Sequence, residues 1–306
     1  MNNFRVSTSP HIYDKSTTSR IMLDVLIALI PALIASIIIF GARAALVTFV
    51  CLASCIIFEW VFNKFTKKPN TINDFSACIT GVLLAFNLPV TIPLWQAVFG
   101  SAVAIILVKQ IFGGLGKNFA NPAITARIVM FLAFAGPMTD WVSPIDGITG
   151  ATPLALIGRG EIEALPGIWD MFIGVRGGSL GETSNLALLI GGIYLMLRKV
   201  ITWHVPVTFI AVVFGLSAVL GQQPVYQLFA GGLFLGAIFM ATDYVTSPQT
   251  NKGRLIFGVG CGLFTVLFRF YSSYPEGVSF AILLMNILTP YINKFTTSKP
   301  FGGVQK

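Results

Sequence analysis

Charge is the scarcest property of this sequence. Only 10% of its 306 residues are charged, whereas 55% are hydrophobic, and the mean hydropathy is +0.81. Soluble domains carry about 25% charged residues, so this deficit excludes an ordinary soluble domain and predicts a chain embedded in a bilayer. The net charge of +8 is therefore interpreted through membrane topology, because Lys and Arg gather on the cytoplasmic side. Nucleic acid is not an expected partner.

Metal-ligating and nucleophilic residues are also scarce. The two histidines, His11 and His204, lie far apart, and no Ser-His-Asp order or P-loop is present. A metal or cluster site needs about four converging ligands, and the cysteines form no CxxC pair, so we expect no metal held by this chain alone. The cysteines all fall in apolar segments, as small packing residues do: Cys51, Cys55, Cys78 and Cys261.

Long apolar segments dominate the rest. The sequence contains ten of them, at 21–41, 44–63, 75–88, 94–112, 122–135, 183–197, 201–220, 225–242, 254–270 and 277–293. A full span needs about 20 apolar residues, so the third, fifth and sixth are expected to be broken helices or to lie in protein-lined polar surroundings. The polar N-terminal region, followed by a run long enough to span, predicts an uncleaved N-terminus on the cytoplasmic side.

The placement of positive charge predicts the orientation. With the N-terminus inside, 15 of the 20 basic residues fall on the cytoplasmic side and four outside, with Arg127 inside the fifth segment. This bias favours cytoplasmic N- and C-termini and an extracytoplasmic loop at 136–182. The inside residues are Arg5, Lys15, Arg20, Lys64, Lys67, Lys68, Lys109, Lys117, Arg198, Lys199, Lys252, Arg254, Lys294, Lys299 and Lys306; the outside ones are Arg43, Arg159, Arg176 and Arg269.

The ten segments divide into a membrane half at 1–135 and another at 183–306 around the loop at 136–182. The second half begins on the opposite side, so an internal repeat would be inverted. TGVLLAFNLPVTIP (80–93) and LGAIFMATDYVTSP (235–248) share Gly, Val, Thr and Pro at four aligned positions. The prediction is an all-α integral membrane protein with about ten transmembrane helices in two inverted five-helix repeats.

Four acidic residues lie in or beside the segments. Ionisable groups within a span are costly and are functional hypotheses by default. Asp74, at the start of the third segment, is interpreted as a helix N-cap, and Glu59, near the end of the second, as an interfacial residue. For Asp24 in the first segment and Asp243 after the eighth, an ion-pathway role and a structural role both stay open.

Two loops stand out. FGGLGKNFANPA (112–123) has glycines that could let the backbone approach a flavin ring or a partner, or simply end a helix.

DGITGATPL (146–154) is a turn of small residues that contains Thr152. A threonine hydroxyl is a weak nucleophile by itself, but an exposed one on a flexible loop can accept a group from another enzyme. From the residues alone, a modification site and an ordinary extracytoplasmic turn both remain open.

DGITGATPL resembles the Asp-x-x-Ser/Thr-Gly-Ala-Thr flavinylation motif, in which a transferase attaches FMN to the last threonine through a phosphodiester bond. Further blocks resemble the D subunit of the Rnf complex, the ion-translocating ferredoxin:NAD oxidoreductase. These are SPHIYDKSTTSRIMLDVLIALIPA (9–32), DFSACITGVLLAFNLP (74–89), FGGLGKNFANPA (112–123), GSLGETSNLALLIGG (178–192) and GAIFMATDYVTSP (236–248). The B subunit of the sodium-pumping NADH:quinone reductase shares them but is longer at its N-terminus, so the short start here favours the Rnf subunit.

The resemblance implies covalent FMN at Thr152. Asp146, Thr149, Gly150 and Ala151 match the transferase recognition pattern, with Thr149 where many members have Ser. A second, non-covalent flavin is also implied, riboflavin in some members. Its candidate lining turn is the GETS block, Gly181, Glu182, Thr183 and Ser184.

The resemblance also implies partners and a place in the cell membrane. Electrons would pass between ferredoxin and NAD through the other Rnf subunits, A, B, C, E and G, coupled to movement of Na⁺ or H⁺. An extracytoplasmic flavin transferase and the lipid bilayer complete the expected partners. The alternative from another class is an inverted-repeat transporter or channel without a redox role, in which Asp24, Asp74 and Asp243 line a pathway.

Overall fold

The computed structural model describes residues 17–69, 71–142, 149–272 and 276–297. Apart from one antiparallel bridge between Val142 and Thr149, regular structure in these residues is helical. The elements of the first half and the loop are α1 (Thr18–Phe40), α2 (Ala42–Phe65), η1 (Ile72–Asp74), α3 (Ser76–Phe86), α4 (Leu94–Ala102), the π-helix η2 (Val103–Gln110), α5 (Pro122–Ala133), α6 (Ala135–Thr139), α7 (Pro153–Arg159), η3 (Ile162–Ala164) and α8 (Ile168–Ile173).

The second half contains α9 (Asn185–Leu197), α10 (His204–Val219), α11 (Pro224–Phe229), α12 (Leu233–Leu235), the π-helix η4 (Gly236–Met240), α13 (Asn251–Tyr271) and α14 (Val278–Thr296). Each of the ten apolar segments is thus helical. Four helices, α1, α2, α13 and α14, are long and apolar enough to cross a membrane. The structure therefore agrees with a membrane protein, and the count of ten crossings stays a prediction.

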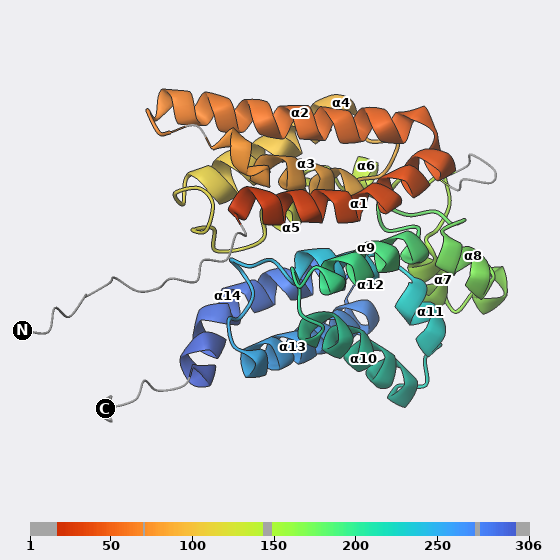
Figure 1. Ribbon diagram of the computed structural model, residues 1–306. Helices are drawn as coiled ribbons and strands as arrows, with labels where there is room; N and C mark the ends of the chain where they lie inside the picture. Colours follow the sequence, from red (N-terminus) through yellow and green to blue (C-terminus); the bar gives the residue numbers. More distant parts are fainter. Residues whose placement is uncertain (1–16, 70, 143–148, 273–275, 298–306) are drawn as a thin grey trace, which may run out of the picture.

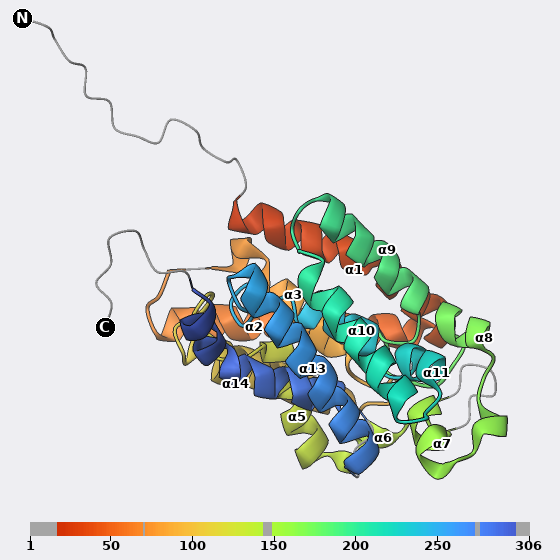
Figure 2. The ribbon, with the colours of Figure 1, turned by 90° about the horizontal axis from the view of Figure 1, so that it is seen from below.

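The two halves form two layers. In Figure 1, α1 to α5 lie in the upper layer, and α9, α10 and α12 to α14 lie in the lower one. Helices α1 and α9 run side by side in both views (Figures 1 and 2), and α5 also contacts α14 across the layers. The start of α1 and the end of α14 lie at one end of the bundle, whereas α7 and α8 lie at the opposite end. The long loop is therefore remote from both of these helix ends.

Close approach of α1 and α9 depends on a small residue. A methyl group built on Gly191 of α9 would collide with the backbone carbonyl oxygen of Ala28 in α1. Small residues allow such backbone contact between membrane helices. The pair is also linked by polar groups, because the Tyr194 hydroxyl and the Arg198 guanidinium both donate to the Asp24 carboxylate, at 3.0 Å and 3.2–3.4 Å.

The third, fifth and sixth segments are short helices, as their lengths predict: α3 has 11 residues, α5 has 12 and α9 has 13. The eighth segment, which the sequence presents as continuous, is interrupted between α11 and α12. Gly231 adopts a left-handed φ of 65° at the interruption, a conformation that glycine adopts without strain. The Arg269 guanidinium donates to the carbonyl oxygens of Gln227 and Ala230 at 2.6 and 3.0 Å. These bonds replace the helical partners that the break removes.

A buried polar network lies near the end of the bundle where α1 begins. Glu59 is fully buried within the protein, and its carboxylate accepts from the Lys109 ammonium at 2.8 Å. Thr71 and Gln110 donate to the other carboxylate oxygen at 2.7 and 3.1 Å. Because Lys109 and Gln110 end the π-helix η2, the irregular turn presents two consecutive residues to one carboxylate. Asp74 ends η1 and accepts from the Ser76 N–H at 2.8 Å, but the N-cap of α3 is Phe75, so the prediction of Asp74 as the N-cap was wrong by one residue.

This network yields a prediction for stability. Lys109→Met leaves the Glu59 carboxylate buried without its cation, a change that costs about 3–5 kcal/mol in proteins. We expect a clearly lower midpoint of thermal unfolding in detergent, and partial recovery in the double variant Glu59→Gln/Lys109→Met. Lys117→Met, at an exposed lysine of the following loop, is the control. Equal midpoints for the two single lysine variants would contradict the prediction.

Candidate functional site

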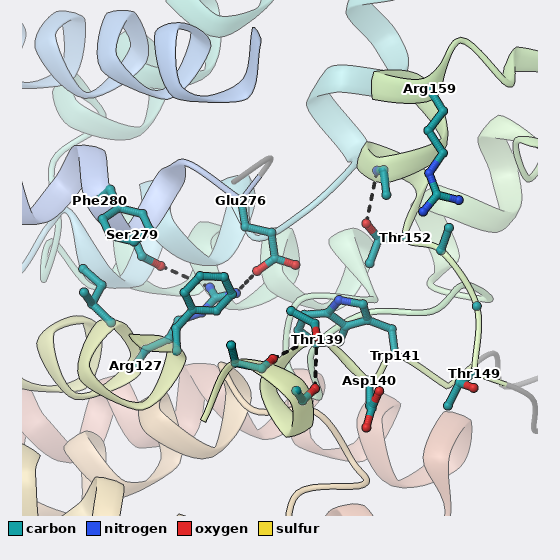
Figure 3. A pocket seen from close by; sticks show the side chains of 17 residues that line it. Arg127, Thr139, Asp140, Trp141, Thr149, Thr152, Arg159, Glu276, Ser279 and Phe280 are labelled. Atoms are coloured by element: carbon teal, nitrogen blue, oxygen red, sulfur yellow. Dashed lines mark hydrogen bonds and ion pairs between the residues drawn. The ribbon is translucent and has the colours of Figure 1, made fainter. Parts of the chain in front are cut away.

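A cavity of about 660 Å³ lies between α5, α6, α7 and the start of α14. Its volume falls in the range of about 300–1,000 Å³ that small-molecule sites occupy. Figure 3 shows its lining, which comes from residues far apart in the sequence. Thr149, Gly150, Ala151 and Thr152 of the DGITGAT stretch all line it, whereas Asp146 lies outside the described residues.

Thr152 is the N-cap of α7. Its hydroxyl oxygen accepts from the Ala155 N–H at 3.3 Å, and Pro153 occupies the first helical position. A capping Thr followed by Pro is a strong local signal for a helix start, so the sequence itself fixes the position of this hydroxyl. Only 7% of Thr152 is exposed, whereas Thr149 and Ala151 are exposed. The motif is therefore exposed at Thr149 and Ala151, but the Thr152 hydroxyl, which was expected to be exposed, is not.

Residues 141–142 and 149–150 contact each other. Val142 forms a bridge with Thr149, and the Gly150 N–H donates to the Trp141 carbonyl oxygen at 2.9 Å. Trp141 is itself buried and lines the cavity. These contacts hold Thr149 and Gly150 beside Trp141 and Val142, and Trp141, Thr149 and Gly150 line the cavity.

One side of the cavity, called its floor below, is formed by an ion pair between α5 and the residues before α14. The Arg127 guanidinium of α5 pairs with the Glu276 carboxylate, just before α14. The same guanidinium donates to the Ser279 hydroxyl at 3.1 Å and to the Asn87 side-chain oxygen at 3.0 Å. Figure 3 shows the Arg127, Glu276 and Ser279 side chains converging. Burial raises the pKa of Glu276 to about 7, while the nearby Arg127 opposes this shift.

The walls combine aromatic and cationic side chains. Phe131 of α5 and Phe280 of α14 meet edge to face, with ring centroids 6.5 Å apart, and Trp141 lies on the loop side. Arg159, from the end of α7, extends beside Thr152 in Figure 3. An aromatic wall suits a flat ring system, and a guanidinium suits an anionic group such as a phosphate. The cavity could hold an aromatic molecule that carries a negative charge.

The GETS turn lies behind this floor, not in the cavity lining. The Gly181 N–H donates to the Phe86 carbonyl oxygen at 3.0 Å, and the Arg176 guanidinium donates to the Glu182 carbonyl oxygen at 2.7 Å. Ser184 is the N-cap of α9, and Thr183 is buried. These contacts place the turn in the core between the two halves.

Asp243 and Asp24 are in different environments. Asp243 follows η4 and lines a second, smaller cavity of about 90 Å³ together with Lys109, Asn118 and Asn121. Burial raises its pKa, while hydrogen bonds from the Thr246 hydroxyl and the Val245 N–H oppose the shift. Asp24 does not line this cavity and is held by Tyr194 and Arg198. The structure thus brings Asp243, and not Asp24, together with the asparagines of the glycine-rich loop.

Several residues of these sites were not identified from the sequence. The sequence indicated Arg127, Arg159 and Lys109 only through the distribution of positive charge, and no pattern indicated Glu276. An arginine inside an apolar segment is itself a signal, because an ionisable group there is expected to be paired or functional. Nothing local, however, identifies Glu276 as its partner, since the two are 149 residues apart.

Comparison with known proteins identifies the family. The model of the NQR2, RnfD, RnfE family matches residues 5–302. The chain is 47% identical over 304 residues to the D subunit of the Na(+)-translocating ferredoxin:NAD(+) oxidoreductase complex of Acetobacterium woodii, covering 98% of this chain and 96% of the relative. It is 39% identical over 325 residues to the D subunit of the proton-translocating ferredoxin:NAD(+) oxidoreductase complex of Clostridium ljungdahlii, covering 98% and 97%.

A third relative is more distant. The D subunit of the ion-translocating oxidoreductase complex of Escherichia coli K12 is 34% identical over 348 residues, covering 98% of each chain. The resemblance inferred from the motif and its flanking blocks is therefore confirmed along nearly the whole sequence, and the chain belongs to the NQR2, RnfD, RnfE family.

Proposed function

We propose that this chain is the flavin-carrying membrane subunit of an ion-translocating ferredoxin:NAD oxidoreductase complex, with FMN attached to Thr152. The observation that carries the proposal is the position of Thr152. The last threonine of the DGITGAT stretch lies on a cavity of about 660 Å³ that also has aromatic and arginine side chains. Family membership and the names of the relatives agree with this role.

The residues present fit the group. Trp141, Phe131 and Phe280 would hold the ring system, and Arg159, which lines the same cavity, would pair with a phosphate linked to the Thr152 oxygen. FMN would supply the one- and two-electron chemistry, while the protein sets its position and potential. Because Thr152 is 7% exposed, a transferase must reach it through the cavity or before α7 packs against its neighbours.

The proposed topology has ten crossings, with the termini in the cytoplasm and the Thr152 cavity outside. It is supported by the positive-inside bias and by the separation of α7 from the first and last helix ends. The two halves at 1–135 and 183–306 are proposed to be inverted repeats around the loop at 136–182. In support, the broken helices α3 and η4 end against each other, since the Asn87 amide lies 3.7 Å from the Met240 sulfur.

The proposed partners are the other subunits of the complex, A, B, C, E and G, and through them ferredoxin and NAD. An extracytoplasmic flavin transferase would load the FMN. The relatives are named for different coupling ions, Na⁺ in one and a proton in another, so the proposal covers both. A second flavin, riboflavin, is also proposed. At the GETS turn it would require Phe86 to move, because that ring packs directly against Gly181.

Thr152→Ala tests the attachment site. The full chain is produced together with a flavin transferase and run on a denaturing gel under ultraviolet light. We expect a fluorescent band in the unmodified sequence and its complete loss in Thr152→Ala, because the oxygen that forms the phosphodiester bond is gone. The control is Thr139→Ala, at a hydroxyl that also lines the cavity but donates to carbonyl oxygens of its own helix. No band in any variant would favour a transporter without a redox role.

Asp243→Asn tests the ion pathway. We expect the assembled complex in vesicles to lose most of its coupled ion transport while the chain keeps its covalent flavin, because the change removes a half-buried carboxylate that lines a different cavity from Thr152. Asp170→Asn, at an exposed carboxylate of α8, is the control. Transport equal to that of the control would remove Asp243 from the pathway.

A further inference from the structure

The cavity that holds Thr152 contains a carboxylate that its proposed function does not use. Arg127, Asp140, Arg159 and Glu276 are its charged lining residues. Asp140 is exposed, but the Glu276 side chain is only 18% exposed and pairs with Arg127, which is 7% exposed. Glu276 is thus the shielded carboxylate of this lining.

Arg127 does not depend on Glu276 to stay in place. Its guanidinium also donates to two neutral acceptors, Asn87 at the end of α3 and Ser279 in α14. A proton added to Glu276 would remove the charge of the pair but leave these two hydrogen bonds intact. The geometry therefore allows Glu276 to change its protonation state without rearrangement of the cavity floor.

Further charges lie behind the pair. A methyl group built on Gly232 would approach both a Glu182 carboxylate oxygen and the Arg127 guanidinium, at 2.6 and 3.9 Å. Arg176 and Arg269 act electrostatically on Glu276, and so does Glu182. Three arginines thus lie around two carboxylates, contributed by α5, α13, the segment before α14 and the segment between α8 and α9.

We infer that Glu276 holds the proton that compensates an electron stored in the cavity. This inference rests on the proposed attachment of a flavin at Thr152. The electron comes from a neighbouring one-electron carrier of the complex, of the flavin or iron–sulfur class. As it arrives, the Glu276 carboxylate forms an O–H bond with one proton from the aqueous side near α7. When the electron leaves, that bond breaks and the proton returns. The net charge of the cavity is unchanged in both steps.

The physical reason is the cost of charge in a poorly solvated site. An uncompensated charge there is far more costly than in water, so electron entry favours uptake of a proton by the nearest group that can accept one. Arginines stay protonated and cannot do this. The elevated pKa of Glu276, about 7, allows the exchange near neutral pH. Burial is its main cause, and Arg127, Arg269 and Arg176 oppose the shift, whereas Glu182 adds to it.

The test follows the carboxyl group directly and not through turnover. The full chain with its covalent flavin is purified in detergent, and infrared difference spectra are recorded between the oxidised and reduced forms at neutral pH. We expect reduction to produce the carbonyl stretch of a newly protonated carboxyl group, shifted in D₂O. This signal should be lost in Glu276→Gln and kept at a shifted position in Glu276→Asp. The control, Glu161→Gln, changes an exposed carboxylate beside α7 and should keep the signal.

The outcomes separate this inference from the proposed function. Covalent fluorescence with an unchanged carboxyl signal in Glu276→Gln overturns the inference alone, and so does a signal lost only in Glu182→Gln. Absence of covalent flavin from the unmodified chain overturns both. If Glu276→Gln does not fold, the unmodified chain and Glu276→Asp decide, because a chain that shows no redox-linked carboxyl signal contradicts the inference directly.

Discussion

Backbone groups that leave a helix inside an apolar bundle need partners, and arginines supply many of them here. Arg269 and Arg176 donate to carbonyl oxygens at the break between α11 and α12 and at the turn before α9. Arg127 connects the residue after α3 with α14. Unpaired backbone groups within hydrocarbon cost several kcal/mol each, so the bonds from Arg269 and Arg176 stabilise the interrupted backbone, whereas Arg127 bonds to side chains and links the two halves.

Charged and polar side chains gather near both ends of the bundle. Toward the start of α1, the Glu59–Lys109 pair and Asp243 lie in or beside a small cavity. Toward α7, Thr152 and the Arg127–Glu276 pair line the large one. Helix α5 connects the two, since Asn121 at its N-terminus lines the small cavity and Arg127 and Phe131 further along line the large one. A single short helix thus contacts both sites, and a shift of this helix would change the shape of both cavities.

Much of the fold could be predicted because the relevant signals are local. Ten apolar segments became helical segments, and the short ones are short helices. Thr152-Pro153 marks a helix start for reasons that two neighbouring residues contain. The break at Gly231 was missed because two glycines in an apolar run are also common where helices pack closely. The ion pair of Glu59 was not predicted because its partner, Lys109, is 50 residues away.

The sequence by itself determined that this is a helical membrane protein, which segments are short, and which threonine matches a flavinylation motif. These properties follow from composition and from residues adjacent in the chain. Only the tertiary structure decided that Thr152 faces a large cavity, that Arg127 and Glu276 form its floor, and that the GETS turn lies behind it. Such contacts join α5, α7, α14 and the loop before α9, and no local pattern encodes which distant side chains meet. Their pairing arises from the packing of the two halves.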